Sequence, residues 1–428
     1  MHRGTLTASV GPEAVVDLLV PGSNVVVPLA NGEPVTVLDA IEAAAPGLAG
    51  VRVHQMHALR DRPYLDGRFG DRLRHVSYFL SPVTRPHHVA GAVDVVPANF
   101  SEVPTLLRGL DRLLVVAAAS PPDRHGFFSL GTNADYVSSL VGRAPLFLEA
   151  NRRMPRTFGR SLVHISQVSG WCEADHPLVA VPSVEPDALD ARIGELVAER
   201  LPDGATIQTG IGAIPNALLA QLAGHRDLGV HTELFSDGLM DLVEAGVVTG
   251  VRKQLNRTKA VATFALGSER LYAFLDENAA VELWPVRYVN DPRIIAQEPN
   301  FVSINSTLTV DLLGQCASES IGSRLYSGSG GQADFARGAM FSPGGQGFIV
   351  LRATTHHGIS RVVPQLQPGA VVTTNKNTVD KVVTEHGVAE LRGRTIGQRA
   401  EALIAVADPP ARDDLRAEAV RLGLLRPA

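Results

Sequence analysis

The sequence has 428 residues, of which 45 % are hydrophobic and 19 % charged, as is typical of a globular protein with two or three domains. Its 39 basic and 44 acidic residues give a net charge of −5 without a long basic stripe, so we do not expect a nucleic-acid partner. No uncharged apolar run reaches the ~18 residues of a membrane span, and the N-terminus lacks the apolar core of a signal peptide. These features predict a cytoplasmic protein without a membrane partner.

The two cysteines, Cys172 and Cys316, are far apart in the sequence. A secreted disulfide scaffold would usually carry an even set of cysteines at short spacings. This pair instead fits a reducing cytoplasm. Neither cysteine lies in a recognisable nucleophile setting, so we expect both to be small core residues.

Short apolar runs alternate with helical patterns through the first part of the chain. The run 113–119 predicts a buried strand that ends at Ser120-Pro121-Pro122, and the run 178–181 predicts another that ends at Pro182. Strands interleaved with helices favour open α/β sheets with mainly parallel pairing. The sequence therefore predicts an α/β fold.

A proline-rich break near 182–186 separates this part from a second α/β pattern. An amphipathic helix is expected at about 188–201, followed by a strand at 205–208, a glycine turn and another helix. We place the boundary at about residue 187, which predicts an N-terminal domain at 1–187 and a C-terminal domain at 188–428. Two further helices are expected at 397–406 and 409–424.

A glycine turn, Gly210-Ile211-Gly212-Ala213-Ile214, follows the strand predicted at 205–208. Glycines let the backbone approach a ligand, and the unpaired N–H groups at the start of a helix suit an anion such as a phosphate. The pattern alone is weak, because many such turns are structural. It lacks the third glycine of a nicotinamide-dinucleotide fingerprint and is not a P-loop, so an oxidoreductase is a distant alternative.

Glu233 follows a short apolar stretch and precedes the helical pattern that begins near Leu239. It therefore lies near the carboxyl end of a predicted strand, where open α/β sheets bind ligands. Position alone favours a surface glutamate in an ion pair or a helix cap. The spacing of His231, Glu233 and Asp237 matches no standard metal site, so we predict no metal.

The region 322–347 is the most glycine-rich of the chain. Its Gly330-Gly331 pair could present backbone N–H groups to an oxyanion, although structural glycine turns are the commoner outcome. Sequence patterns of regular structure on both sides indicate a loop fixed between ordered elements and not a flexible linker.

These three features fit one chemistry, in which a glutamate acts as a covalent nucleophile toward an acyl-CoA. Attack on the thioester gives an acyl-glutamyl anhydride, and the released CoA thiolate then forms a glutamyl-CoA thioester. This route needs a glutamate, oxyanion donors and a slot for coenzyme A, without a metal or redox cofactor.

Further motifs extend over nearly the whole chain. In chain order they are Gly32-Glu33-Pro34, Ser120-Pro121-Pro122-Asp123-Arg124-His125-Gly126, Ser129-Leu130-Gly131, Asn151-Arg152-Arg153-Met154-Pro155-Arg156-Thr157, His231-Thr232-Glu233, Ser236-Asp237-Gly238, Val289-Asn290-Asp291-Pro292, Ser303-Ile304-Asn305-Ser306, Tyr326-Ser327-Gly328-Ser329-Gly330-Gly331-Gln332-Ala333-Asp334-Phe335 and Val383-Thr384-Glu385-His386-Gly387. Together they resemble the acetyl-CoA hydrolase/transferase family of class I CoA-transferases, most closely the 4-hydroxybutyrate and butyryl-CoA:acetate branch.

The resemblance implies roles for particular residues. Glu233 falls on the glutamate that forms the CoA thioester, and Asn290 with the Gly331 N–H falls on the oxyanion hole. The segment Gly210-Ile211-Gly212-Ala213-Ile214, Gly331 and Thr355 fall on coenzyme A contacts. Asn31 or Arg153 is implied as a wall of the acyl site.

The sequence departs from the family pattern at two places. Relatives often have a Ser-Thr-Ala-Lys-Gly-Gly run where this chain has Ala353-Thr354-Thr355-His356-His357-Gly358, so His356 replaces the usual lysine region. Ser329 stands where a valine is more familiar. Both changes border the implied acyl site, which predicts a substrate other than the short fatty acids of better-known members.

The resemblance therefore implies a CoA-transferase with acyl-CoA and small carboxylic acid substrates, assembled as a homodimer or homotetramer. An acyl-CoA hydrolase with the same glutamate is the nearest alternative, because water could attack the same intermediate. A catalytically silent CoA-binding protein is another, against which the presence of Glu233 beside an intact glycine loop argues.

Overall fold

The computed structural model describes residues 8–427 of the chain. Residues 1–7, which bear on the predicted absence of a signal peptide, and residue 428 lie outside this range. The described chain forms two compact units. The first unit runs to Pro182 and includes Val261–Val289, and the second comprises Ser183–Ala260 and the residues from Asn290 onward.

This division differs from the single domain boundary that the sequence predicts at about residue 187. The first break lies a few residues earlier, and the chain returns to the first unit at Val261–Val289. Backbone hydrogen bonds fix this return, since the N–H groups of Ala134 and Asp135 donate to Thr263 O at 2.9 and 3.0 Å. Sequence periodicity reports the kind of element but not the core against which it packs, so the return leaves no local signal.

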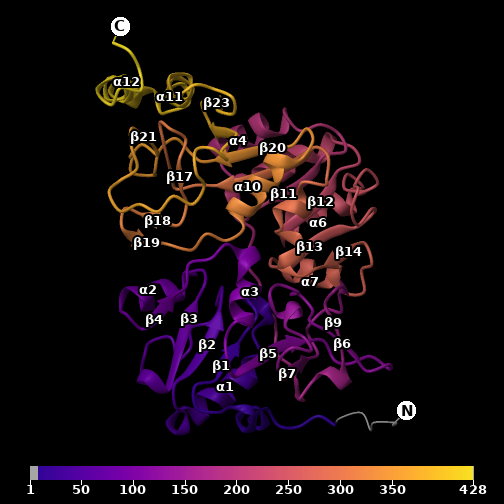
Figure 1. Ribbon diagram of the computed structural model, residues 1–428. Coiled ribbons are helices and arrows are strands. Elements are labelled where there is room, and N and C mark those ends of the chain that lie inside the picture. The colour runs from indigo at the N-terminus through magenta and orange to yellow at the C-terminus, as the bar shows by residue number, and fades with distance from the viewer. Residues whose placement is uncertain (1–7, 428) are drawn as a thin grey trace. The chain divides into compact units, whose positions relative to one another are not determined.

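A seven-stranded sheet organises the first unit, with all of its pairings parallel (Figure 1). Its spatial order is β10-β7-β5-β1-β2-β3-β4. The strands are β1 (Asn24–Val26), β2 (Val51–Gln55), β3 (Leu73–Ser77), β4 (Val93–Val95), β5 (Leu113–Ala119), β7 (Leu146–Asn151) and β10 (Gly170–Ala174). Strand β5 confirms the prediction at 113–119. Residues of this sheet that are fully buried, such as Val25, Val53 and Leu148, form the core.

The other elements of the first unit are short. The helices are α1 (Val35–Ala44), α2 (Thr84–Val89), α3 (Val103–Arg108), α7 (Glu269–Leu275) and α8 (Val286–Val289). The remaining strands are β6 (Phe127–Ser129), β8 (Phe158–Gly159), β9 (Leu162–His164), β13 (Ala260–Ala265) and β14 (Val281–Leu283), of which β14 pairs in parallel with β8.

The strand predicted at 178–181 is wrong. The segment is extended but joins no sheet: the backbone groups of Val179 bind side chains, and the Val181 N–H donates to a backbone oxygen, Gly267 O, at 2.9 Å. The Val179 N–H donates to Asn31 Oδ1 at 2.8 Å, and Val179 O accepts from Asn31 Nδ2 at 2.9 Å and from the Tyr272 hydroxyl at 2.8 Å. Prolines at 177 and 182 flank it and remove ladder donors.

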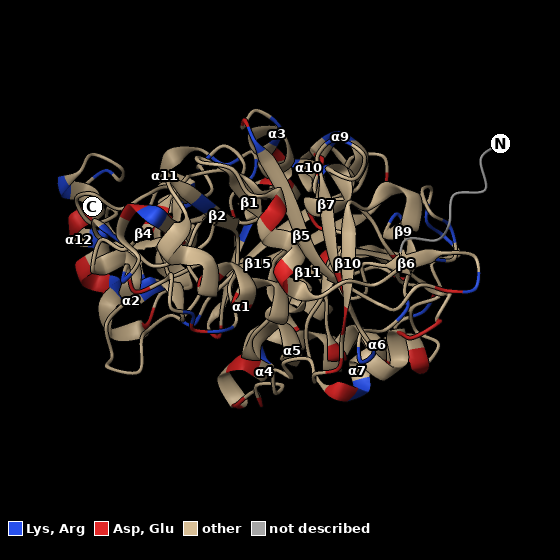
Figure 2. Ribbon diagram, turned by 90° about the horizontal axis from the view of Figure 1, so that it is seen from below, with Lys and Arg blue, Asp and Glu red and all other residues tan. Residues whose placement is uncertain are grey.

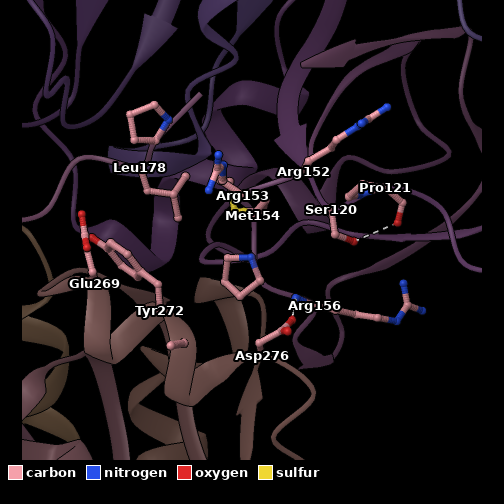
Figure 3. Close-up of a pocket in the computed structure, with 13 residues that line it drawn as sticks. Ser120, Pro121, Arg152, Arg153, Met154, Arg156, Leu178, Glu269, Tyr272 and Asp276 are labelled. Carbon is pink, nitrogen blue, oxygen red and sulfur yellow. Dashed lines mark hydrogen bonds between the residues drawn. The ribbon is translucent and has the colours of Figure 1, made fainter. Parts of the chain in front are cut away.

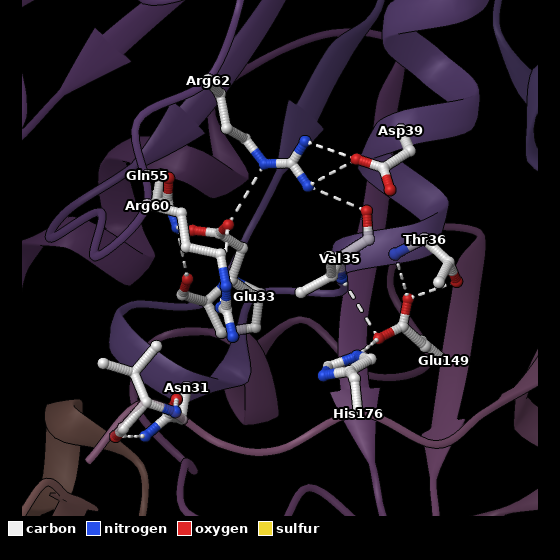
Figure 4. A network of polar contacts seen from close by, with 12 residues as sticks. Asn31, Glu33, Val35, Thr36, Asp39, Gln55, Arg60, Arg62, Glu149 and His176 are labelled. Atoms are coloured by element: carbon white, nitrogen blue, oxygen red, sulfur yellow. Dashed lines mark hydrogen bonds and ion pairs between the residues drawn. The ribbon is translucent and has the colours of Figure 1, made fainter.

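A buried carboxylate fixes the start of α1 in the first unit (Figure 4). Glu149 accepts from the backbone N–H groups of Val35, Thr36 and Val37 at 3.1, 2.7 and 3.2 Å, and pairs with His176 Nε2 at 2.7 Å. Although burial alone would raise the pKa of Glu149, the bonds from His176 and Thr36 hold it below its usual range. The carboxylate thus satisfies helix donors that would otherwise be buried without partners.

The second unit contains a sheet whose strands are also mainly parallel. Within this unit the strands follow the order β23-β22-β20-β15-β11-β12, and all of these pairings are parallel apart from the antiparallel β22–β23 pair. The strands are β11 (Thr206–Thr209), β12 (Gly229–Phe235), β15 (Phe301–Ser306), β20 (Gln346–Val350), β22 (Lys381–Thr384) and β23 (Gly387–Glu390). Parallel pairing places the carboxyl ends of β11, β12, β15 and β20 at one edge.

Helices and small sheets complete the second unit (Figure 1). The helices are α4 (Ala188–Ala198), α5 (Ala213–Gln221), α6 (Asp237–Glu244), α9 (Pro292–Ile295), α10 (Gln332–Phe341), α11 (Ile396–Ala405) and α12 (Arg412–Arg421). The small strands are β16 (Thr309–Asp311), β17 (Cys316–Ala317), β18 (Ser320–Ile321), β19 (Arg324–Leu325) and β21 (Val362–Val363). The predicted α/β class with largely parallel sheets is therefore confirmed, as are the helices expected near 188–201, 397–406 and 409–424.

Acidic and basic residues occur along the same elements, as on α12 (Figure 2). On α12, Arg421 pairs with Glu418 at 2.6 Å, and Arg416 pairs with Glu401 of α11 at 2.8 Å. Both cysteines are buried and free, as expected of core residues. Within residues 8–427, no helix has the length and apolar character needed to cross a membrane.

Candidate active site

Glu233 lies near the carboxyl end of β12, with its carboxylate directed at two N–H donors. Asn290 Nδ2 donates to Glu233 Oε2 at 2.8 Å, and the Gly331 N–H also donates to the carboxylate. Asn290 is fully buried in the short connection between α8 and α9. The structure therefore brings together three predicted residues that are far apart in the sequence, all within the second unit.

Gly331 has to be glycine for this contact to form. A Cβ atom there would lie 2.0 Å from Glu233 Oε2 and 2.3 Å from Asn290 Nδ2. Such distances do not occur between real atoms, so any side chain would displace the carboxylate or the amide. Gly330, the preceding residue, takes the left-handed conformation at φ +55°, which glycine adopts without strain and which turns the chain into α10.

Burial raises the pKa of Glu233 to about 7, from an ordinary value of 4.5. The hydrogen bond from Asn290 acts in the opposite direction, the charge of Asp334 raises the pKa further, and the Gly331 N–H lowers it. The ionised carboxylate is thus less solvated than in water but keeps two donors. Such a group is a stronger nucleophile than a free glutamate at neutral pH.

The turn Gly210-Ile211-Gly212-Ala213-Ile214 connects β11 to α5 at the same edge of the sheet. It lies next to the Glu233 strand, because the Thr232 hydroxyl donates to Thr209 O at 3.1 Å and accepts from Thr209 N at 3.4 Å. A Cβ atom at Gly210 or Gly212 would meet no atom within 4 Å, and Ile211 is 56 % exposed. The turn therefore leaves open space beside backbone N–H groups.

Thr355 lies in a different part of the second unit, on a hairpin that follows β20. Its hydroxyl accepts from the N–H groups of His357 and Ile359 at 3.3 and 3.2 Å, which closes the turn. His356 and His357 are exposed at the tip, with ring centroids 3.8 Å apart. In the order of the sheet, strands β15 and β11 lie between β20, which precedes this hairpin, and β12, which carries Glu233.

Asn31 and Arg153, the residues implied as acyl-site walls, lie in the first unit. Both amide hydrogens of Asn31 are engaged, one by Val179 O and one by the Tyr272 hydroxyl at 2.8 Å. Arg153 lines a cavity of about 530 Å³ with Met154, Leu178 and Tyr272 (Figure 3). Its Nε donates to Asp175 Oδ1 at 2.8 Å. Asn31 is not among the residues that line this cavity, but it donates to the hydroxyl of Tyr272, which is.

Sequence reasoning did not assign a role to Asp334, in the first turn of α10. It is 5 % exposed, and its charge is one of the causes that raise the pKa of Glu233. Its spacing of three residues from Gly331 is the signal that could have found it, because a residue in the first helical turn lies near the group bound at the helix start. Within the described residues, no cluster of three or more His, Cys, Asp or Glu side chains is placed to hold a metal ion.

The fold and this site define an α/β protein that presents a partly desolvated glutamate with two N–H donors at the carboxyl edge of a parallel sheet. Such an arrangement suits covalent acyl chemistry, since donors around a carboxylate oxygen also stabilise the oxyanion formed when a nucleophile adds to its carbon.

Comparison with known proteins agrees with this class. The acetyl-CoA hydrolase/transferase N-terminal domain model matches residues 10–184, and the C-terminal domain model matches residues 267–419. A succinyl-CoA:cyclohexane-1-carboxylate CoA transferase of Geobacter metallireducens is 44 % identical, covering 92 % of this chain and 91 % of the relative. A 4-hydroxybutyrate coenzyme A transferase of Clostridium kluyveri is 41 % identical, covering 95 % and 96 %.

Solved structures show the same fold. The crystal structure of RipA from Yersinia pestis superposes with a TM-score of 0.93 at 36 % identity, covering 97 % of this chain and 98 % of RipA. A 4-hydroxybutyrate CoA-transferase of Porphyromonas gingivalis gives a TM-score of 0.82 at 36 % identity, covering 97 % of each chain. The chain belongs to the acetyl-CoA hydrolase/transferase family, and its full-length relatives include several CoA-transferases.

Proposed function

We propose that this protein is a CoA-transferase that moves coenzyme A between an acyl-CoA and a free carboxylic acid, with Glu233 as the covalent carrier. The observation that carries the proposal is the placement of two N–H donors, Asn290 Nδ2 and the Gly331 amide, on the Glu233 carboxylate. The CoA-transferase names of relatives at 44 % and 41 % identity support the same reaction class.

The reaction proceeds in two halves. A Glu233 carboxylate oxygen attacks the thioester carbon of the acyl-CoA, and the C–S bond breaks to give an acyl-glutamyl anhydride and CoA thiolate. The thiolate attacks the Glu233 carbonyl carbon, the anhydride C–O bond breaks, and the donor acid leaves as its carboxylate. A second carboxylic acid then runs these steps in reverse, taking the CoA and restoring free Glu233. No proton needs to be added or removed overall.

The donors act when the thiolate adds to the glutamyl carbon. The carbonyl oxygen of Glu233 becomes an oxyanion at that moment, and it lies where Asn290 Nδ2 already donates at 2.8 Å. Donors placed in advance need little reorganisation during the reaction, and one such donor contributes about 100- to 1,000-fold in rate. The same pair serves both halves of the reaction, because the second half passes through the same thioester.

Coenzyme A occupies the open space beside Gly210-Ile211-Gly212-Ala213-Ile214 in this proposal. The exposed Ile211 side chain and the free backbone N–H groups at the start of α5 suit the apolar and amide parts of a pantetheine chain. Thr355 is a second proposed contact, at the hairpin after β20. Metal and redox cofactors have no step in this scheme.

We expect continued consumption of acyl-CoA to depend on the acceptor acid. With an acyl-CoA and a carboxylate acceptor, initial rates should show the parallel double-reciprocal lines of a ping-pong mechanism, and the acceptor should appear as its CoA ester. Without acceptor, acyl-CoA consumption should stop after at most one equivalent per site, because the CoA stays on Glu233 as a thioester. Continuous thioester loss without acceptor, at a rate close to that with acceptor, would instead identify an acyl-CoA hydrolase that uses the same glutamate.

The pH dependence follows from the state that Glu233 needs for attack. Its carboxylate has to be ionised, and its pKa is raised to about 7, so kcat/KM for acyl-CoA should decline as the pH falls below about 7 and level off above it. Initial rates at subsaturating acyl-CoA across the acid and neutral range measure this. A rate that stays constant down to the ordinary glutamate value of 4.5 would contradict the assignment.

The acids that the relatives act on are small carboxylates, such as 4-hydroxybutyrate for the Clostridium kluyveri enzyme. We propose the same substrate class here. The homodimeric or homotetrameric state and the cytoplasmic location remain predictions.

A further inference from the structure

Glu319 is a buried carboxylate beside the glycine loop. It immediately precedes β18, is 6 % exposed, and its backbone oxygen accepts from the N–H groups of Tyr326 and Ser327 at 2.7 and 3.2 Å. These bonds continue the ladder of the β18–β19 hairpin, in which Ser320 pairs with Leu325. The backbone of Glu319 therefore holds the point where the chain leaves the hairpin and enters the loop 327–331.

The Glu319 side chain accepts a hydrogen bond from the middle of that loop. Both of its carboxylate oxygens lie 3.3 Å from Ser329 Oγ, and no other hydrogen bond or ion pair to this carboxylate occurs within residues 8–427. A buried carboxylate without a cationic partner is costly. A shorter apolar residue could fill this place at a lower desolvation cost. The contact with Ser329 is therefore what the buried carboxylate contributes.

Both ends of the loop are tied to one neighbouring segment, Thr373 and Thr374. Ser318 N donates to Thr373 Oγ1 at 3.0 Å on the Glu319 side, and Gln332 Nε2 donates to Thr374 Oγ1 at 3.1 Å on the α10 side. With the ends fixed, the remaining freedom lies in 328–330, which contains two glycines. The Ser329–Glu319 contact restrains this stretch two residues before Gly331.

We infer that Glu319 is a positioning residue which, through the Ser329 hydroxyl, fixes the loop so that the Gly331 N–H points at Glu233. This inference rests on the proposed function of the Glu233 site and assigns a role to Ser329, the loop position at which this chain departs from the more familiar valine. Glu319 does not touch substrate in this role. A misplacement of the Gly331 amide by a fraction of an ångström weakens a donor that acts on the oxyanion.

The test compares variants of the intact enzyme that either remove or keep the contact. Glu319→Ala and Ser329→Ala remove it, whereas Glu319→Gln and Ser329→Thr keep an acceptor and a hydroxyl. Ser323→Ala, an exposed hydroxyl in the turn of the same hairpin, is the matched control. Thermal unfolding of each variant checks that it folds, and Ser329→Ala, a small change, keeps the test possible if Glu319→Ala does not.

We expect Glu319→Ala and Ser329→Ala each to lower kcat about 10- to 100-fold, with KM for acyl-CoA nearly unchanged. The double variant should be no worse than either single variant, because both remove one contact. Since the Gly331 N–H lowers the pKa of Glu233, weakening it should move the acid limb of the pH–rate profile to higher pH. Glu319→Gln, Ser329→Thr and Ser323→Ala should resemble the wild type.

Several results would overturn the inference. One is a folded Glu319→Ala or Ser329→Ala enzyme whose kcat lies within twofold of the wild type. Another is a loss of kcat with an unmoved acid limb, or an equal loss in Glu319→Gln, either of which indicates general disruption. Absence of acceptor-dependent transfer in the wild type would instead reject the proposed function itself, so the two failures are distinguishable.

Discussion

Glu233→Gln is expected to abolish transfer, lowering kcat by about 10⁴-fold or more, because removal of a covalent nucleophile leaves no alternative route. Glutamine keeps the shape and the oxygen that accepts from Asn290 Nδ2, which lies 2.8 Å from Glu233 Oε2 in the wild type. It lacks the negative charge that attacks the thioester. Acceptor-dependent formation of a new CoA ester, followed by chromatography, measures the loss.

Measurement of Tm distinguishes loss of the nucleophile in Glu233→Gln from loss of the folded structure. The folded-state pKa of Glu233, about 7, lies above its ordinary value of 4.5, so the folded state holds a proton that the unfolded state has released between these values. The stabilisation from this proton is present below about pH 4.5 and is lost as the pH rises through about 7. Glu233→Gln cannot ionise, so above pH 7 its Tm should equal or exceed that of the wild type.

A matched control is Glu390→Gln, which changes an exposed glutamate on β23 of the same unit. It should keep full activity. If folded Glu233→Gln retained more than a small fraction of wild-type transfer, and the preparation contained no deamidated enzyme, the nucleophile would be another residue.

Gly331→Ala is expected to lower kcat by about 100- to 1,000-fold, the cost of losing one oxyanion donor, although the change adds a single methyl group. The backbone at Gly331, with φ −97° and ψ 3°, is open to alanine, so strain in the backbone is not the cause. The cause is contact, since the new Cβ would lie 2.0 Å from Glu233 Oε2 and 2.3 Å from Asn290 Nδ2. The carboxylate, the amide or the loop has to move.

Gly224→Ala provides the control for Gly331→Ala, because a Cβ at Gly224 meets no atom within 4 Å. Single-turnover measurement of acyl loss from acyl-CoA, with Tm recorded for both variants, isolates the chemical step. A Gly331→Ala enzyme with wild-type single-turnover rates would show that the Gly331 amide does not take part in the reaction.

Local sequence patterns predict the sheets and the placement of Glu233. The apolar run at 113–119 matches β5, and the position of Glu233 near the end of an apolar stretch matches β12. Hydrophobic periodicity reports burial directly, which is why these elements are predictable. The run at 178–181 misleads because its apolar residues are extended, while the backbone groups of Val179 bond to Asn31 and Tyr272 and not to a neighbouring strand.

The residues that contact Glu233 cannot be predicted from local sequence patterns. Asn290 is 57 residues away in the sequence, and its setting at a helix junction has no distinctive composition. The family resemblance points to it, whereas spacing alone does not. Glu319 and Asp334 also act through tertiary proximity, and a single sequence shows neither the burial of Glu319 nor its contact with Ser329. A site whose side chains come from distant segments can be recognised only in the folded structure.

The most direct test of the central claim is to trap the intermediate on Glu233. The wild-type enzyme is incubated with an acyl-CoA in the absence of acceptor, treated with borohydride, digested and examined by peptide mass spectrometry. A glutamyl-CoA thioester predicts that the peptide carrying Glu233 has its side-chain carboxyl reduced to an alcohol, and that this product is absent without acyl-CoA and in Glu233→Gln. Reduction at another residue, or an unmodified Glu233 in enzyme that is actively transferring CoA, would contradict the account.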